Sequence, residues 1–222
     1  MIYPKINGLY KRFTEGPFKN QFMDGRDGGI TEFARNEFGL LYDNTWVGTE
    51  KIDGTNIRVY LRHDNEGDHV AIKGRSDNAQ IPADLLKRLE DLFVHDTQWA
   101  EVFNEGVDVT LYGEGYGDRI QKVGSLYNPH GVDFILFDIR IGNFWLVRSD
   151  VNEIAEKLGI LSVPVVFAGT LKQAEEEVKK GFHSEISAEP LEAEGMVLVP
   201  LGGFLDRGGN RIITKLKARD YR

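Results

Sequence analysis

Alternating apolar and polar residues mark the strands of this chain. The run Ile57-Arg58-Val59-Tyr60-Leu61 alternates at every position, which predicts a strand with one buried face and one polar face. The segment 64–68, Asp-Asn-Glu-Gly-Asp, predicts a turn to the next strand. Strands are predicted over 45–50, 56–62, 69–73, 107–112, 132–146, 163–168, 194–199 and 210–217, with a hairpin turn at Gly142-Asn143 inside 132–146.

Helices are predicted between these strands. Pro82 begins one of them, and its apolar residues Leu85, Leu86, Leu89, Leu92 and Phe93 share one face. Thr170 and Gln173 form the pattern of a capping box, and Gly181 ends that helix. Further helices are predicted near 31–38, over 97–104, and from a cap at Ser149 and Asp150 to Gly159. The glycine-rich run 24–29 is predicted to be a loop or short hairpin.

The order of these elements predicts one α+β domain over residues 1–222, with residues 1–44 as an N-terminal extension packed on it. The composition fits a globular chain, since 41% of its 222 residues are hydrophobic and 28% are charged. No apolar run is long enough to cross a membrane, and the N-terminus lacks the apolar core of a signal peptide. The absence of cysteine excludes disulfides and thiolate metal sites. We therefore expect a cytoplasmic protein, or a phage-encoded one in its host's cytoplasm.

The net charge of −8 is unusual for a protein that binds nucleic acid, because phosphate contacts require lysine and arginine. The charge is uneven, however. The acidic excess gathers at 175–177 and 185–194, whereas the last residues are basic. A local basic surface on an acidic body is therefore expected. The five histidines lack ligand spacing, so no zinc site is expected. The basic residues near the end are Arg207, Arg211, Lys215, Lys217, Arg219 and Arg222, against Asp206 and Asp220.

The run Thr49-Glu50-Lys51-Ile52-Asp53-Gly54-Thr55-Asn56 carries the clearest chemical signal. It places a lysine at a turn between acidic residues and directly before a strand. A lysine amine is a nucleophile once it loses its proton, which a positioned and partly desolvated lysine can do near neutral pH. The alternative is a surface lysine in an Asp-Gly turn.

Four further segments follow in a fixed order, at 111–117 (LYGEGYG), 134–139 (FILFDI), 194–198 (EGMVL) and 213–217 (ITKLK). With the Lys51 run, this series resembles the covalent nucleotidyltransferases, the superfamily of ATP-dependent DNA and RNA ligases and mRNA capping enzymes. The run 50–56, Gly113-Glu114 and the segment 120–123 (IQKV) are similar to the nick-sealing RNA ligase 2 family. The resemblance covers residues from about 45 to 217.

The resemblance implies an ATP-grasp-like ligase adenylation domain, with antiparallel sheets flanked by helices and the nucleotide between the sheets. It implies that Lys51 attacks the α-phosphate of ATP, with Mg²⁺ or Mn²⁺ as the metal. Cations near Lys51, namely the metal and the pair Lys215 and Lys217, would lower its pKa. These two lysines share a face of one strand, where they would stabilise charge on the phosphate. The catalytic residues are thus Lys51, Lys215 and Lys217.

Nucleotide-contacting roles follow from the same resemblance. Glu114 is expected to bind the ribose, and its two flanking glycines to let the ligand approach. Phe137 is expected to stack on adenine, on the face opposite Phe134. Glu194, rather than the nearby Glu192, is expected to hold the metal or a metal-bound water. The full nucleotide-binding set is Glu50, Lys51, Asp53, Asn56, Arg75, Glu114, Phe137, Glu194, Lys215 and Lys217, and Gln121 and Lys122 match the family pattern without an assigned role.

The implied activity is ATP-dependent joining of 3′-hydroxyl and 5′-phosphate ends, of RNA in preference to DNA. An ATP-dependent DNA ligase fits the same motif, and a capping guanylyltransferase would share the core. A non-catalytic nucleotide- or RNA-binding module would not require the lysine nucleophile. Only five residues follow Lys217 and fifty precede Lys51. We therefore expect no accessory nucleic-acid-binding domain, and an accessory partner could take its place. We also expect a monomer.

Overall fold

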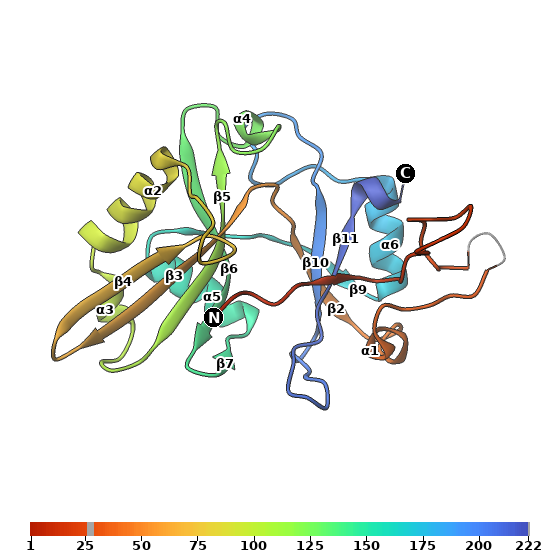
Figure 1. Cartoon of the computed structure of the whole chain (residues 1–222), viewed down its shortest axis with the longest axis horizontal. Coiled ribbons are helices and arrows are strands. Elements are labelled where there is room, and N and C mark those ends of the chain that lie inside the picture. The colour runs from red at the N-terminus through yellow and green to blue at the C-terminus, as the bar shows by residue number, and fades with distance from the viewer. Residues whose placement is uncertain (26–28, 222) are drawn as a thin grey trace. The chain divides into compact units, whose positions relative to one another are not determined.

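A computed structural model describes residues 1–25 and 29–221 (Figure 1). The described chain forms two compact units, each with its own sheet and its own hydrophobic core. Among the described residues, no helix is both long and apolar enough to cross a membrane. Unit 1 comprises Met1–Pro4, Ile52–Pro164 and Ser184–Leu191, and unit 2 comprises the described residues of Lys5–Lys51, Val165–His183 and Glu192–Arg222.

Unit 1 contains a mostly antiparallel sheet with strand order β4-β3-β5-β6-β7, to which β8 adds a parallel pairing with β6. One face of this sheet packs against helices, and the core there includes Ile57, Val59, Leu85, Phe134 and Val151. Figure 1 shows β3 and β4 as a long hairpin beside β5. The strands are β3 (Thr55–Asp64), β4 (Gly67–Lys73), β5 (Val109–Gly117), β6 (Val132–Ile141), β7 (Phe144–Trp145) and β8 (Leu161–Ser162). The helices are α2 (Ala83–Glu90), the π-helix η1 (Asp91–His95), α3 (Trp99–Val102), α4 (Gly124–Tyr127) and α5 (Arg148–Lys157).

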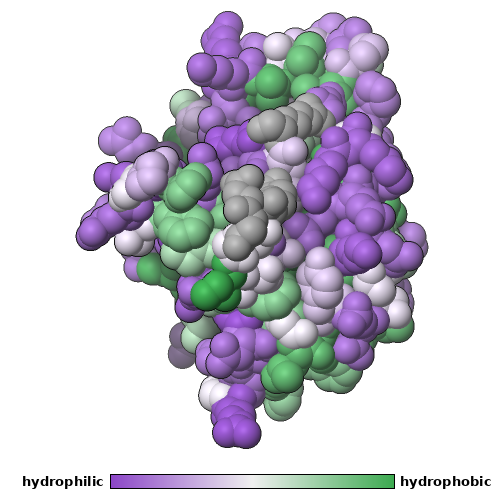
Figure 2. All heavy atoms as spheres, turned by 90° about the vertical axis from the view of Figure 1, so that its right-hand side faces the viewer, coloured by the Kyte–Doolittle hydropathy of each residue, from purple (hydrophilic) through white to green (hydrophobic). Residues whose placement is uncertain are grey.

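Unit 2 contains a five-stranded sheet of order β1-β11-β10-β2-β9. Its pairings are antiparallel except that of β1 with β11. The core lies between this sheet and helix α6, where Trp46 and Leu198 pack with Leu171 and Val178. Figure 2 shows the side of unit 2 that carries α6, where hydrophilic side chains predominate and apolar patches are small. The elements are β1 (Asn7–Gly8), α1 (Asn36–Leu40), β2 (Trp46–Glu50), β9 (Val165–Gly169), α6 (Leu171–Lys180), β10 (Gly195–Pro200), β11 (Thr214–Lys217) and the 3-10 helix η2 (Ala218–Asp220).

The predicted α+β class with antiparallel sheets flanked by helices is confirmed. The alternation in β3 is also confirmed on its apolar side, because Ile57, Val59 and Leu61 are buried. The capping box of α6 forms as predicted: Thr170 Oγ1 accepts from the Gln173 amide, and the Gln173 side chain accepts from the Thr170 amide. The single domain over 1–222, with its packed extension, stays a prediction.

Several predicted boundaries are wrong. The helix expected near 31–38 is α1, and it begins only at Asn36, because Phe33 and Ala34 pair with the backbone of Tyr10 and Leu9 instead. Helix α5 begins at Arg148 after an N-cap at Val147, so neither Ser149 nor Asp150 caps it. The strand expected over 210–217 is confined to β11, and helix α4 was not predicted. Of the loop predicted over 24–29, residues 26–28 lie outside the described residues.

One residue of the acidic run 175–177 is buried. Glu175 lies on the inner side of α6 and accepts hydrogen bonds from Tyr10 Oη at 2.8 Å and Tyr42 Oη at 2.9 Å. Burial, together with the neighbouring carboxylate, raises the pKa of Tyr42 to about 12, so that hydroxyl keeps its proton. Glu175 is therefore a structural residue of unit 2 rather than part of a solvated acidic face.

Candidate active site

Three strands of unit 2 bring the predicted catalytic residues to one end of its sheet. Lys51 follows β2 directly, Glu194 directly precedes β10, and Lys217 is the last residue of β11. The register pairs Gly195 with Lys217, and the Lys51 amide donates to the Gly195 carbonyl at 2.9 Å. Because neighbouring antiparallel strands alternate in direction, the start of β10 meets the ends of β2 and β11.

Glu194 joins the two lysines through its carboxylate. Its Oε2 accepts from Lys51 Nζ, and its Oε1 accepts from Lys217 Nζ at 2.7 Å. The three side chains are 17 to 22% exposed. Burial by itself would raise the pKa of Glu194, but the charge of Lys51 and hydrogen bonds from both lysines outweigh that effect and lower it. Glu194 therefore stays ionised near neutral pH and fixes both amines.

The lowered pKa of Glu194 predicts a pH dependence of stability. The folded chain holds this carboxylate ionised at pH values where an ordinary glutamate, near 4.5, takes up a proton. Its contribution is therefore present above about pH 4.5 and is lost as the pH falls through the lowered folded-state pKa. Thermal unfolding of the wild type and Glu194→Gln should show a stability difference at pH 6 that shrinks towards pH 3. A difference independent of pH would contradict the ion pairs.

The glycine after Glu194 is required by the backbone. Gly195 has a φ of +145°, and a Cβ there would lie 2.9 Å from the Leu216 carbonyl carbon. The alternative acid, Glu192, is exposed and its backbone forms an isolated bridge with His183. Of the two glutamates, Glu194 is thus the one whose side chain holds the lysines.

Lys215 and Lys217 share a face of β11, as predicted, because the alternating residues Thr214 and Leu216 are the buried ones. The sequence predicted cations near Lys51. In the structure the Lys51 amine donates to the carboxylate of Glu194, which also accepts from Lys217. Glu50, the last residue of β2, is 2% exposed and pairs in register with Met196.

The other predicted residues lie in unit 1. Glu114 on β5 stands between Asn56 on β3 and Ile135 on β6 in the register of the sheet. The Asn56 Oδ1 atom is buried and has no hydrogen-bond partner among the described residues. Because a buried polar atom without a partner is costly, this amide is suited to accept a hydrogen bond from a ligand.

The glycines beside Glu114 serve a different purpose from the expected one. Gly113 and Gly115 point to the opposite face of β5, as strand alternation requires. A Cβ on Gly113 would meet the Phe134 ring, and one on Gly115 would meet Leu85. Both glycines therefore make room for core side chains, and the expectation that they admit a ligand is wrong.

Phe137 lies at an irregularity of β6, where the register with β5 shifts beside Tyr112. Phe134 is buried in the core under the helices, whereas Phe137 packs at the edge of a separate cluster around Ile52. The two rings thus belong to different clusters, as the predicted opposite faces require. Sequence reasoning missed Tyr3, whose ring lies edge-on to Phe137 at 5.1 Å and whose hydroxyl donates to Asp138 at 2.7 Å. Tyr3 lies outside any periodic pattern in the sequence, so no sequence signal singled it out.

The turn after Lys51 is held by side chains from Gln121 and from Tyr127 at the end of α4. The Gln121 side-chain amide donates to the Gly54 carbonyl at 3.0 Å, and the Asp53 amide donates to Tyr127 Oη at 3.4 Å. Gly54 itself packs closely on β5, since a Cβ there would lie 2.7 Å from Glu114 Cγ. Gln121, left without a role by sequence reasoning, therefore fixes the Asp53-Gly54 turn.

Arg75 lies in the loop after β4 and is exposed. No hydrogen bond or ion pair of its side chain occurs within the described part of the chain. It can therefore reach a ligand without first breaking an internal contact. Its predicted role in nucleotide binding stays a prediction.

The carboxylate oxygens of Glu194 are suited to bind a divalent metal ion. Both carboxylate oxygens are bonded to lysines, but each oxygen has a second lone pair. Magnesium is usually held by one or two carboxylates together with substrate phosphates and water. Within the described residues, the group with three close metal ligands lies elsewhere, at Asp64, Glu66 and His69 on the β3–β4 hairpin. The Asp64 carboxylate there is already bonded by Arg62 at 2.8 Å, and the expected absence of a zinc site stays a prediction.

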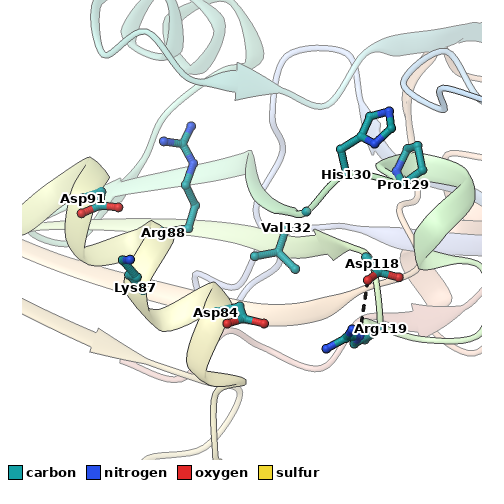
Figure 3. Close-up of a pocket in the computed structure, with 10 residues that line it drawn as sticks. Asp84, Lys87, Arg88, Asp91, Asp118, Arg119, Pro129, His130 and Val132 are labelled. Carbon is teal, nitrogen blue, oxygen red and sulfur yellow. Dashed lines mark ion pairs between the residues drawn. The ribbon is translucent and has the colours of Figure 1, made fainter.

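A surface hollow of about 450 Å³ lies between α2 and the loops around Arg119 and His130 (Figure 3). It is lined by the three carboxylates Asp84, Asp91 and Asp118 and by the three cations Lys87, Arg88 and Arg119. Arg119 pairs with Asp118, and Arg88 pairs with Asp133. No predicted site residue lines this hollow, and its balanced charges give it no preference for phosphate.

Comparison with known proteins agrees with this arrangement of motifs. Residues 44–217 match the family described as RNA ligase, so the chain belongs to the RNA ligase family. No curated protein is similar enough in sequence to count as a relative.

Among solved structures, Naegleria gruberi RNA ligase has the same fold. A mutant without ligand matches with a TM-score of 0.62 and 20% identity, over 83% of this chain and 52% of that one. The same ligase with pyrophosphate matches with a TM-score of 0.60 and 21% identity, over 83% and 52% of the two chains. A mutant with ATP and manganese matches with a TM-score of 0.64 and 17% identity, over 100% and 61%. The present chain thus spans about half to three-fifths of the length of these ligases.

Proposed function

We propose that this chain is the nucleotidyltransferase domain of an ATP-dependent RNA ligase, which joins 3′-hydroxyl and 5′-phosphate ends through a lysyl-AMP intermediate. The observation that carries the proposal is the Glu194 carboxylate, which holds Lys51 and Lys217 together at one end of three strands. Membership of the RNA ligase family supports it over residues 44–217. The ATP- and manganese-bound state of the Naegleria ligase supports the choice of nucleotide and metal.

In the first step, the neutral amine of Lys51 attacks the α-phosphorus of ATP. A P–N bond forms, the bridging α–β P–O bond breaks, and pyrophosphate leaves. Glu194 orients Lys51 Nζ, and its contact with that atom offers an acceptor for the proton that the amine loses. Splitting ligation through a covalent enzyme intermediate makes each step easier than a direct condensation.

The charge that develops on the α-phosphate is stabilised by Lys217 and Lys215. Fixed cations act strongly on such charge because they need no reorganisation during the reaction. The Glu194 contact holds Lys217 Nζ in position before ATP binds. A Mg²⁺ or Mn²⁺ ion at Glu194 would supply further positive charge at the phosphates.

The remaining nucleotide-binding roles follow from the family resemblance of the motifs. Glu114 binds the ribose hydroxyls, Asn56 accepts a hydrogen bond with its buried amide oxygen, and Phe137 stacks on adenine. Arg75 contacts a phosphate, which its exposed and unengaged guanidinium permits. Glu50 and Asp53 flank the nucleophile and complete the nucleotide-binding set.

In the later steps, AMP passes from Lys51 to the 5′-phosphate of a nucleic acid, and a 3′-hydroxyl then displaces AMP. RNA ends are the preferred substrate, in keeping with the family. We further propose that the protein is a monomer and works in the cytoplasm. An accessory nucleic-acid-binding partner would strengthen its binding of the substrate. Nothing specific in the site favours DNA ends or a purely binding role, and binding alone would not need the lysine amine at Glu194.

The test is to incubate the chain with α-labelled ATP or GTP and Mg²⁺, and then with nicked RNA and nicked DNA duplexes. Covalent label is expected from ATP and not from GTP, followed by sealing of RNA nicks faster than DNA nicks. Label from GTP would instead indicate a capping-type enzyme. Absence of label from both nucleotides would overturn the proposed activity.

A further inference from the structure

Arg58 departs from the pattern that surrounds it in the sequence. The alternation along β3 assigns it to the polar face, where an arginine is ordinarily solvated. In unit 1 its side chain is instead 1% exposed and is among the largest fully buried side chains. An arginine remains charged in a protein, so burying it is costly unless its donors are paired.

Each nitrogen of the Arg58 guanidinium has its own acceptor. Nε donates to the Gly74 carbonyl at 2.8 Å, Nη1 to Tyr60 Oη at 2.6 Å, and Nη2 to Asp77 Oδ1 at 2.9 Å. The hydrogen bond from Arg58 also lowers the pKa of Asp77, which keeps that carboxylate ionised. The buried cation therefore has an acceptor at each of its three nitrogens.

Two of these three acceptors bracket one short loop. Gly74 and Asp77 lie on either side of Arg75 and Ser76 in the turn after β4. The loop also folds back on itself, because the Ala79 amide donates to the Ser76 carbonyl at 3.2 Å. Gly74 is buried, and a Cβ on it would lie 2.8 Å from Ala79 Cβ. Arg58 thus fixes the backbone on both sides of Arg75, while the Arg75 side chain stays exposed.

We propose that Arg58 is a positioning residue that places Arg75 for contact with a phosphate of ATP. This inference rests on the proposed function, because that function gives Arg75 its ligand. Arg58 itself is buried behind the loop and acts through it. The planar guanidinium of Arg58 suits this role, because its donors point in fixed directions and bond three acceptors at once. A lysine cannot do so in the same geometry.

The experiment measures single-turnover labelling of Lys51 by α-labelled ATP across ATP concentrations, in Arg58→Lys, Arg75→Ala and the double variant. The quantity compared is the maximal labelling rate divided by the ATP concentration that gives half of that rate. Arg58→Lys is expected to lower this ratio by about 10-fold to 10²-fold, since a small misplacement of a binding group can cost that much. In the Arg75→Ala background, the same substitution should cause no further loss.

A purely structural role predicts the opposite pattern. If Arg58→Lys lowers labelling by the same factor with and without Arg75, Arg58 only supports the fold and the inference is overturned. Asp77→Asn provides a second variant should Arg58→Lys fail to fold, because the Asp77 side chain is 67% exposed. It should lower labelling by about threefold, as expected for an exposed ion pair, and again only when Arg75 is present. Asn78→Ala, in the same exposed loop, is the matched control and should label normally.

The outcome also separates this inference from the proposed function. If the wild type takes up no label, the ligase activity fails, and the coupling of Arg58 to Arg75 is then measured by equilibrium binding of ATP. If the wild type labels but the two substitutions act additively, the ligase activity stands and only the role of Arg58 fails.

Discussion

Replacing Lys51 by alanine is expected to reduce covalent labelling by α-labelled ATP to background, because we propose that the P–N bond forms at the Lys51 amine. The fold should survive the change. Lys51 lies at the end of β2 outside the core, and Glu194 keeps Lys217 as a partner when the Lys51 amine is removed. Gel-resolved uptake of label, with thermal unfolding as a check on folding, measures both effects.

Lys51→Arg separates charge from nucleophilicity at this position. Arginine retains a cation for Glu194 but stays protonated and cannot attack. We therefore expect it to preserve thermal stability and still take up no label. The matched control is Lys172→Ala on the exposed side of α6, which should label like the wild type. Label that persists in Lys51→Ala would assign the nucleophile to another residue.

Replacing Lys217 or Lys215 by alanine is expected to slow labelling by about 10²-fold or more in each case, as loss of a fixed charge-stabilising group commonly does. Lys217→Ala also removes one of the two cations that hold Glu194, so it should raise the pKa of that carboxylate. Arginine should rescue poorly at either position, because its planar fork does not reproduce a point charge. Single-turnover labelling at saturating ATP measures the loss.

Near-normal labelling by both alanine variants would contradict a role for these lysines at the phosphate. It would mean that they are only solvated basic residues at the end of β11. Separate effects are informative as well. Lys217 bonds Glu194 directly, and Lys215 lies on the same face of β11, so loss of rate confined to Lys217→Ala would limit the phosphate contact to Lys217. Lys172→Ala again serves as the control.

Local patterns in the sequence were sufficient for much of the fold. The buried apolar side of β3, the capping box of α6 and the α2 helix after Pro82 depend on neighbouring residues along the chain, and all three form. The helix near 31–38 was misplaced because Phe33 and Ala34 pair with residues more than twenty positions away. A propensity argument contains no information about such distant partners.

The sequence by itself determined the class of this protein, because the motif order from Lys51 to Lys217 depends only on residue types and spacing. It also singled out Glu194, through the glycine that follows it. Tertiary structure alone decided which charges meet. It placed the Glu194 carboxylate between Lys51 and Lys217, buried Glu175 beside two tyrosines, and enclosed Arg58 behind the Arg75 loop. The physical reason is that a polar residue's exposure and its partners are set by strand register and packing between distant segments, which periodicity along the chain does not encode.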